Sequence, residues 1–453
     1  MSELMNPLAE FVCNTTYADL PPALVARTKR HILDTFGATL AGSDSPIARS
    51  VQQLAAAEGA AGQAGIWGCS LATSPRNAAW LNGVAAHMYE LDDTGGCDHS
   101  GAVVLPAVMA ALALCPGAVS GQRLLTAVVV GYDVGRRVLE ACGGYTAHNE
   151  AGWHSTATCG VFGAAAAVAS LLQLDRSQTI SALGIAASFS GGLWGFINDG
   201  TQSKKLHAGR AAEGGLLAAQ LAASGVSGPA CTFDDVWGGF LKTFAPHSLI
   251  PTALTADLGQ VWKLNRCSIK PYASCRSTHS AIDAVGLLMQ QHALEAAGID
   301  AIEVQLNPFL LDMCGTRDRT SLASAQMSLP YALAARVLLG HAGLSAWDES
   351  FRMSAELAAM MARVTLQIDP QHSFDDEPLI TLVTRDGARH SMQVTLPLGG
   401  PENPLSDLLL EEKYRQLAQR VLPAAQCEAL LEVCNALEQQ VDVKPMLALL
   451  SLS

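Results

Sequence analysis

The sequence has few charged and few aromatic residues, and it lacks a long apolar run. Charged residues make up 15% of its 453 residues and aromatic residues 6%, whereas hydrophobic residues make up 49%. So little charge predicts helices with most of their surface buried, in a chain long enough for two domains. No stretch approaches the roughly 18 uninterrupted apolar residues of a membrane span. The N-terminal segment lacks a basic stretch followed by an apolar block, so we expect no secretory signal and a cytoplasmic protein.

Several familiar motifs are also missing. The twelve cysteines never form a Cys-x-x-Cys pair, which favours free thiols in a reduced compartment over a disulfide framework. Neither a phosphate-binding glycine loop after a strand nor a G-x-S-x-G turn is present, so nucleotide binding and serine-hydrolase chemistry have no support. His87 and Glu90 have a spacing that suits a metal, but no second ligand pair follows, and we expect no metal.

The balance of charge excludes two classes of partner. The chain carries 28 basic and 41 acidic residues, a net charge of −13. Nucleic acid and anionic membrane surfaces are therefore unsuitable partners. An acidic protein with local basic clusters still binds small acids, so function is sought in those clusters.

Helical patterns fill the first part of the chain. Pro21-Pro22 opens a helix that ends near Gly42, and Ser74-Pro75 opens another that we expect to run to Thr94. Small residues in the later helices allow close helix contacts. The further helices are predicted over 103–115, 121–141, 156–172, 177–188 and 205–223.

The pattern changes near Cys267. Alternating residues predict strands at 302–306 and 364–368, and two runs around Arg385-Asp386-Gly387 predict a hairpin over 380–396. Helices are predicted between these strands, at 279–294 and 328–339, and again from Leu405 to Leu450. We therefore expect a mainly α fold: a helical domain (1–264), an inserted α+β domain (265–398) and C-terminal helices (399–453) that complete the helical domain.

Two polar clusters contain histidines. On the expected helix, His87, Glu90 and Thr94 share one face, and the glycine-rich loop after it carries His99. In the second cluster, Ser155 or Thr156 caps a helix and places His154 at its positive end, which lowers the pKa of the imidazole. Solvent-facing acids in the first cluster and a packed core histidine in the second are the plainer alternatives.

Two further clusters are cationic. Residues 200–212 place Lys204, Lys205, His207 and Arg210 at the start of a helix, with Gly200, Thr201 and Ser203 as turn and capping residues, an arrangement suited to a carboxylate or phosphate. Residues 270–279 place Lys270, Tyr272, Arg276 and His279 at the expected domain junction, where ligands often bind. The plainer alternatives are a solubilising helix start and an exposed linker.

Taken in order, these clusters resemble the MmgE/PrpD family over nearly the whole chain. The matching segments are 91–94 (Leu-Asp-Asp-Thr), 99–106, 152–156 (Gly-Trp-His-Ser-Thr), 200–212, 270–279 and 328–331. The resemblance implies a helical domain with a smaller α+β lid, a homodimer, and cofactor-free chemistry on di- and tricarboxylates. It places Thr94, His99, His154, Lys204, Lys270 and His279 in the site. Two departures affect the substrate: Glu90 stands where dehydratase and decarboxylase members usually carry aspartate, and the loop before His99 is shorter and lacks their proline.

The reactions implied by the resemblance share one chemical demand. A carbon beside a carboxylate loses a proton or CO2, so negative charge develops there and cations must lie near its oxygens. We assign His99, His154, Lys204 and His279 to catalysis and expect Glu90, Thr94, Lys270, Tyr272, Arg276 and His207 to bind substrate. The leading hypothesis is a cofactor-independent lyase that dehydrates or decarboxylates a small polycarboxylate. An epimerase or racemase of a dicarboxylate such as iminodisuccinate, and a non-catalytic carboxylate-binding protein, are the alternatives.

Overall fold

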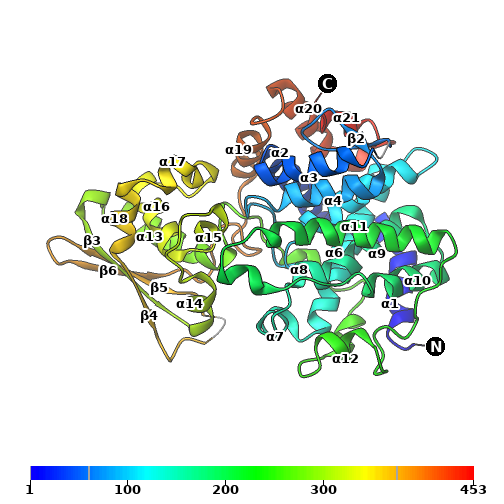
Figure 1. Ribbon diagram of the computed structural model, residues 1–453, viewed down its shortest axis with the longest axis horizontal. Helices are drawn as coiled ribbons and strands as arrows, with labels where there is room; N and C mark the ends of the chain where they lie inside the picture. The colour runs from blue at the N-terminus through cyan, green and yellow to red at the C-terminus, as the bar shows by residue number, and fades with distance from the viewer. Residues whose placement is uncertain (1, 60–61, 374–375, 453) are drawn as a thin grey trace.

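The computed structural model describes residues 2–59, 62–373 and 376–452, and it confirms a mainly helical chain with a small α+β part (Figure 1). The longer helices of the first part enclose a core of alanine, valine and leucine side chains. The elements of this part are α1 (Met5–Asn14), α2 (Pro22–Ser43), α3 (Pro46–Ala57), β1 (Ala64–Gly65), β2 (Ala72–Thr73), α4 (Pro75–Ala86), α5 (Ser100–Ala111), α6 (Gly121–Ala141), α7 (Gly144–Glu150), α8 (Ser155–Thr158), α9 (Gly160–Leu172), α10 (Arg176–Ala187), α11 (Ser203–Ala223) and α12 (Phe240–Phe244).

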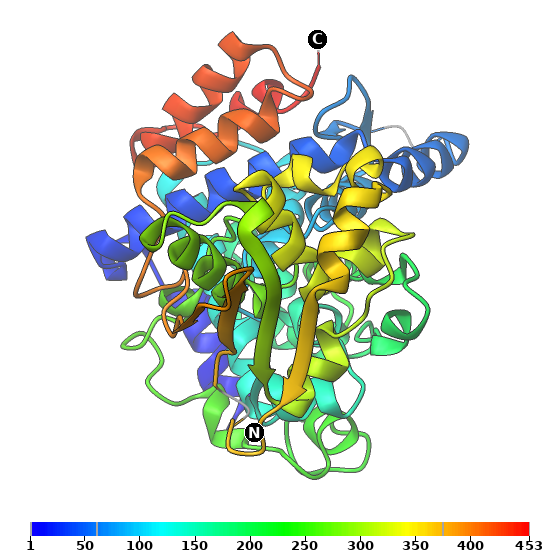
Figure 2. The ribbon, with the colours of Figure 1, turned by 90° about the vertical axis from the view of Figure 1, so that its left-hand side faces the viewer.

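A four-stranded sheet forms the second part of the molecule. Its strand order is β4-β3-β5-β6, with β3 parallel to β4 and antiparallel to β5. The predicted hairpin is confirmed as the antiparallel pair β5–β6. Helices α13 and α16 pack on this sheet around a second apolar core (Figure 2). The elements are α13 (His279–Gln291), β3 (Ile299–Leu306), α14 (Pro308–Cys314), α15 (Leu322–Gln326), α16 (Leu329–Leu339), α17 (Glu349–Arg352), α18 (Ala355–Ala362), β4 (Val364–Ile368), β5 (Leu379–Thr384) and β6 (Arg389–Gln393).

The C-terminal helices return to the first part. Helices α19 (Asp407–Ala418) and α20 (Ala424–Asn435) pack against α2, and α21 (Met446–Leu449) packs against α20 (Figure 1). The two chain crossings between the parts run side by side, because Ile269 N–H donates to the carbonyl of Gly399 at 2.9 Å.

Helices α4 and α11 are in backbone contact, and this contact positions the polar clusters. A Cβ atom on Gly83 would lie 2.7 Å from Gly209 Cα, and one on Gly209 would lie 2.4 Å from the carbonyl oxygen of Trp80. Only glycine at these two positions allows so close an approach. The C-terminal end of α4 therefore lies beside the N-terminal end of α11.

One stretch has the length and composition of a membrane span. Residues 155–172 form an 18-residue window with a mean hydropathy of 1.6, but 89% of the window is buried inside the fold. It contains α8 and α9 and is the central core segment of the helical part.

Three local predictions were wrong. Helix α4 ends at Ala86 rather than near Thr94, because His87 leaves the helical conformation and Glu90 has a left-handed backbone (φ +53°). Helix α11 begins without a side-chain cap, so Gly200, Thr201 and Ser203 do not cap it. His154 itself is the N-cap residue of α8, in place of Ser155 or Thr156.

Candidate active site

A pocket of about 340 Å³ lies between the helical part and the sheet part. It is closed on one side by an antiparallel bridge, in which Thr94 and Ser268 exchange backbone hydrogen bonds of 3.0 and 2.7 Å. The pocket is lined by residues from both parts. The predicted site residues on its wall are Glu90, Thr94, His99, Lys204, Lys270 and Arg276.

Three lysines converge on Glu90, which lines this pocket. The Nζ atoms of Lys204 and Lys205 lie 2.8 and 2.6 Å from Glu90 Oε1, and Lys270 Nζ lies 3.3 Å from Oε2. All four side chains are buried. Burial acts to raise the pKa of Glu90, but the three ammonium groups outweigh it and hold this pKa well below its usual value. With one carboxylate against three cations, this lysine cluster keeps excess positive charge for an anionic ligand.

The cations of the lysine cluster are not equivalent. Burial lowers the pKa of Lys205 to about 8, whereas contact with Glu90 raises the pKa of Lys204 despite its burial. Lys204 Nζ also lies 5.8 Å from the ring centroid of Trp194, which lines the same pocket. Lys204 is therefore the firmly charged lysine on the pocket wall.

The loop between α4 and α5 forms a histidine–carboxylate cluster. Asp92 accepts hydrogen bonds from two imidazoles: His87 Nδ1 lies 3.1 Å from it and His99 Nδ1 lies 2.8 Å from it. Asp98 lies on the other side of His99, with Oδ2 3.5 Å from Nε2. Burial acts to lower the pKa of His99, but the charges of Asp98 and Asp92 outweigh it and raise this pKa above its usual value. His99 therefore carries a proton readily and lies at the pocket wall.

Asp93 anchors this loop from behind. Its carboxylate accepts hydrogen bonds from Tyr132 Oη at 2.6 Å and from the backbone N–H of Gly101 at 2.8 Å, and His31 Nδ1 lies 2.7 Å away. Its own carbonyl oxygen lies 3.1 Å from His99 Nδ1. These bonds fix the backbone that carries His99.

His154 is fully buried behind Asp98. Its Nδ1 lies 2.8 Å from Nδ1 of His207, and its Nε2 lies 3.8 Å from Asp98 Oδ2. Burial, together with the nearby His207 and Lys204, holds the pKa of His154 well below its usual value. The expected direction is confirmed, but burial rather than the helix terminus is the main cause.

The remaining predicted residues lie outside the pocket wall. Neither His154 and His207 nor Tyr272 and His279 are among its described lining residues. Tyr272 donates its hydroxyl proton to Asp283, and His279 Nε2 lies 3.3 Å from the carbonyl oxygen of Ser274. Arg210 lies on the surface and pairs with Glu213. The 270–279 segment is largely buried rather than an exposed linker.

The structure adds residues that sequence reasoning did not assign to the site. Asp92 and Asp98 hold His99, and Trp194 and Cys275 line the pocket. The two acids were visible beside Thr94 and His99 in the sequence. Cys275 lies within the 270–279 cluster of the sequence, whereas Trp194 does not stand out without tertiary contacts.

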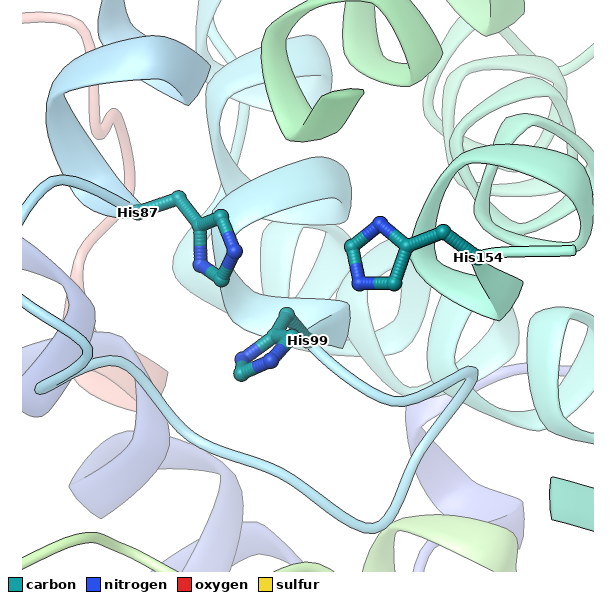
Figure 3. Close-up of side chains that lie close together, drawn as sticks. All are labelled: His87, His99 and His154. Carbon is teal, nitrogen blue, oxygen red and sulfur yellow. The ribbon is translucent and has the colours of Figure 1, made fainter. Parts of the chain in front are cut away.

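One histidine group has the composition of a metal site. One ring nitrogen from each of His87, His99 and His154 lies within 4.8 Å of the others (Figure 3). The rings come from the end of α4, the start of α5 and the start of α8. All three are buried.

Comparison with known proteins agrees with this arrangement. Residues 6–250 match the MmgE/PrpD N-terminal domain and residues 272–439 match the MmgE/PrpD C-terminal domain. The chain is 30% identical to the cis-aconitate decarboxylase-like protein oryM of Aspergillus oryzae, with 98% of this chain and 96% of the relative covered. It is 28% identical to cis-aconitate decarboxylase of Aspergillus terreus (99% and 96% covered) and 28% identical to that of Homo sapiens (95% and 91% covered).

Proposed function

Because this chain belongs to the MmgE/PrpD family of lyases, we propose that it is a cofactor-independent decarboxylase of cis-aconitate or a closely similar tricarboxylate. The relatives' names support the reaction, and the two-part pocket supports a substrate with several carboxylates. The observation that carries the proposal is the position of His99, a buried imidazole that is held by two carboxylates and lines the same pocket as Lys204 and Lys270.

The reaction needs fixed positive charges beside a substrate carboxylate and a group that donates a proton. When the C–C bond to the leaving carboxylate breaks, CO2 departs and its bonding electrons form a new C=C bond. The electrons of the original double bond then move to the carbon beside another carboxylate. That carbon takes up a proton. Fixed cations near that carboxylate stabilise the charge as it develops. The products are CO2 and an isomeric unsaturated diacid.

The residues on the pocket wall divide these tasks. His99 gives the proton to the carbon, and Lys204 and Lys270 bind the carboxylate that receives the negative charge. Arg276, which also lines the pocket, binds a second carboxylate. Glu90 holds the lysines in place between catalytic cycles.

His154 acts from behind the pocket as a positioning residue. Its Nε2 lies 3.8 Å from Asp98 Oδ2, and the same carboxylate oxygen lies 3.5 Å from His99 Nε2. Asp98 also accepts a hydrogen bond of 2.8 Å from Thr94 Oγ1. Through Asp98, His154 and Thr94 set the direction in which His99 points.

An experiment in D2O tests the proposal. Proton NMR follows the protein with cis-aconitate, citrate, 2-methylcitrate and iminodisuccinate in separate samples. We expect new vinyl signals from cis-aconitate, with one deuterium in the product, and CO2 release measured in parallel. Deuterium exchange at an α carbon without a new alkene would identify an epimerase instead. Binding without any exchange would leave a carboxylate-binding protein and contradict the proposed lyase activity.

A further inference from the structure

The histidine trio of His87, His99 and His154 has a feature that proton transfer alone does not require. The ring centroids of His87 and His99 are 4.2 Å apart, and that of His154 lies 6.2 and 6.3 Å from them. The three side chains project from different elements toward one another (Figure 3). His87 is fully buried and does not line the pocket described above.

Each ring of the trio is held through its Nδ1 atom. The Nδ1 atoms of His87 and His99 lie 3.1 and 2.8 Å from the same carboxylate, that of Asp92. The Nδ1 atom of His154 lies 2.8 Å from His207. When Nδ1 carries the proton that donates to such a partner, the lone pair of a neutral imidazole is on Nε2. Histidine ligands in protein metal sites have the same arrangement: one ring nitrogen is hydrogen-bonded to the protein, here Nδ1, and the other, here Nε2, is left for the ion.

Within the part of the chain that the structure describes, the Nε2 atoms of the trio have no hydrogen-bond partner or only distant ones, as expected of metal ligands without their ion. His87 Nε2 is buried and has no hydrogen-bond partner among the described residues; Glu90 Oε1 is 3.7 Å away. The Nε2 atoms of His99 and His154 lie 3.5 and 3.8 Å from Asp98 Oδ2, and Thr156 Oγ1 lies 3.3 Å from His154 Nε2. Asp98 thus adds an anionic oxygen donor to the three nitrogen donors. Three imidazoles with a carboxylate form a donor set typical of Zn²⁺ and related ions.

We propose that His87, His99 and His154 form an inhibitory binding site for a divalent transition-metal ion such as Zn²⁺. A bound ion takes up the Nε2 lone pair of each ring and prevents His99 from carrying a proton to the substrate. The binding part of this proposal stands on the geometry of the trio, whereas the inhibitory part rests on the proposed decarboxylase function. The ion is a regulator of the site and takes no part in the reaction.

Calorimetric titration of the tag-free, chelator-treated protein with Zn²⁺ tests the binding part. We expect one ion per chain. His87→Asn should abolish this binding event, and Asp92→Asn, which keeps all three rings but loosens two of them, should weaken it about 10–100-fold. The matched control is His292→Asn, which removes one ring of the stacked surface pair His292–His390 and should leave the affinity unchanged. Absence of binding by the wild-type protein, or equal weakening by the control, would overturn the site.

Co²⁺ then reports the ligand type, which matters in a chain with twelve cysteines. We expect visible bands of a four- or five-coordinate ion with nitrogen and oxygen ligands. A strong thiolate-to-metal band in the near ultraviolet would place the ion on cysteine and overturn the assignment. This measurement uses the wild-type protein, so it decides the question even if a variant fails to fold.

Turnover of cis-aconitate separates the two proposals. We expect Zn²⁺ to stop CO2 release and a chelator to restore it. If Zn²⁺ binds the trio and the metal-free protein still releases no CO2, the decarboxylase proposal fails and the metal site stands. If turnover is measured but no Zn²⁺ binds, the metal site alone fails. Unchanged turnover while Zn²⁺ is bound to the trio would overturn the proposal that the ion inhibits the enzyme.

Discussion

Lys413 donates a hydrogen bond of 2.8 Å to the carbonyl oxygen of Leu91, which lies 322 residues earlier in the chain. The same ammonium group lies 2.5 Å from Asp34 Oδ1 on α2. Leu91 belongs to the loop that carries Asp92 and His99. A helix near the C-terminal end therefore holds the loop that carries His99 against the core of the first part.

Lys413→Met should destabilise the protein and reduce its activity. The change leaves the fully buried carboxylate of Asp34 without its cation, and breaking a buried pair in this way costs about 3–5 kcal/mol. Urea unfolding at pH 7 measures the loss. The exposed pair Lys242–Asp235 supplies the control, since Lys242→Met should change stability by less than about 0.5 kcal/mol. If both variants lose the same free energy of unfolding, Lys413 contributes no more than an exposed surface residue.

His99→Asn and Lys204→Met should affect different kinetic constants. Removal of a positioned proton donor typically lowers the rate about 10²–10⁴-fold, so His99→Asn should lower kcat by this amount with little change in KM. Lys204→Met removes a cation that binds the substrate before and during the reaction, so KM should also rise. Steady-state CO2 release, with circular dichroism as a check on folding, measures both. A His99→Asn variant with wild-type kcat would remove His99 from the mechanism.

Cys275 should react with iodoacetamide at unusually low pH. The hydrogen bond from Cys314 lowers the pKa of Cys275 to about 6 against the effect of burial, and Lys204 and Lys270 act in the same direction. Because the thiolate is the reactive form, the alkylation rate should fall below about pH 6 and level off above it. Mass spectrometry of the Cys275 peptide gives the rate, and exposed Cys231 is the thiol with which its pH profile is compared.

Cys314→Ala is the matched variant for this measurement. Loss of the donor should raise the pKa of Cys275 and move the plateau of the rate to higher pH. Substrate in the pocket should slow alkylation, because Cys275 lines the pocket wall. A rate that keeps rising to pH 9 in the wild-type protein would contradict the prediction.

Gly209→Ala should be strongly destabilising. The added methyl group would lie 2.4 Å from the carbonyl oxygen of Trp80, so the two helices have to separate. Overpacking of this kind costs about 1–3 kcal/mol. Gly117→Ala is the control, because a Cβ atom there meets no atom within 4 Å. Thermal unfolding should show a large loss only for the first variant, and CO2 release should fall with it.

Much of the fold was predictable because local signals agreed with tertiary packing. Helix 121–141 has its Ser120 cap and an apolar face, and it was predicted with the correct limits. The hairpin was found from alternation around Asp386-Gly387. Where a helix or strand is defined by its own residues, periodicity and turn chemistry were sufficient.

The errors occur where distant residues decide the local structure. The sequence predicts too long an α4 helix because it contains no glycine between Ala86 and Gly95. It ends early because Glu90 turns inward to three lysines, of which Lys270 lies 180 positions further along the chain. Likewise, the sequence places His87 in a polar cluster, but its link to His99 through Asp92 depends on the folded loop. Local sequence does not contain such information.

The backbone contact between α4 and α11 bears on how the side chains of this site can be substituted during evolution. Because glycine meets backbone at Gly83 and Gly209, main-chain atoms rather than side chains set the spacing between the end of α4, which leads into the loop of Glu90, and the start of α11, which carries Lys204. Side chains at those ends can then be exchanged without moving the frame that holds them. The spacing of the two helices is thus independent of the side chains on the pocket wall, as long as Gly83 and Gly209 are kept.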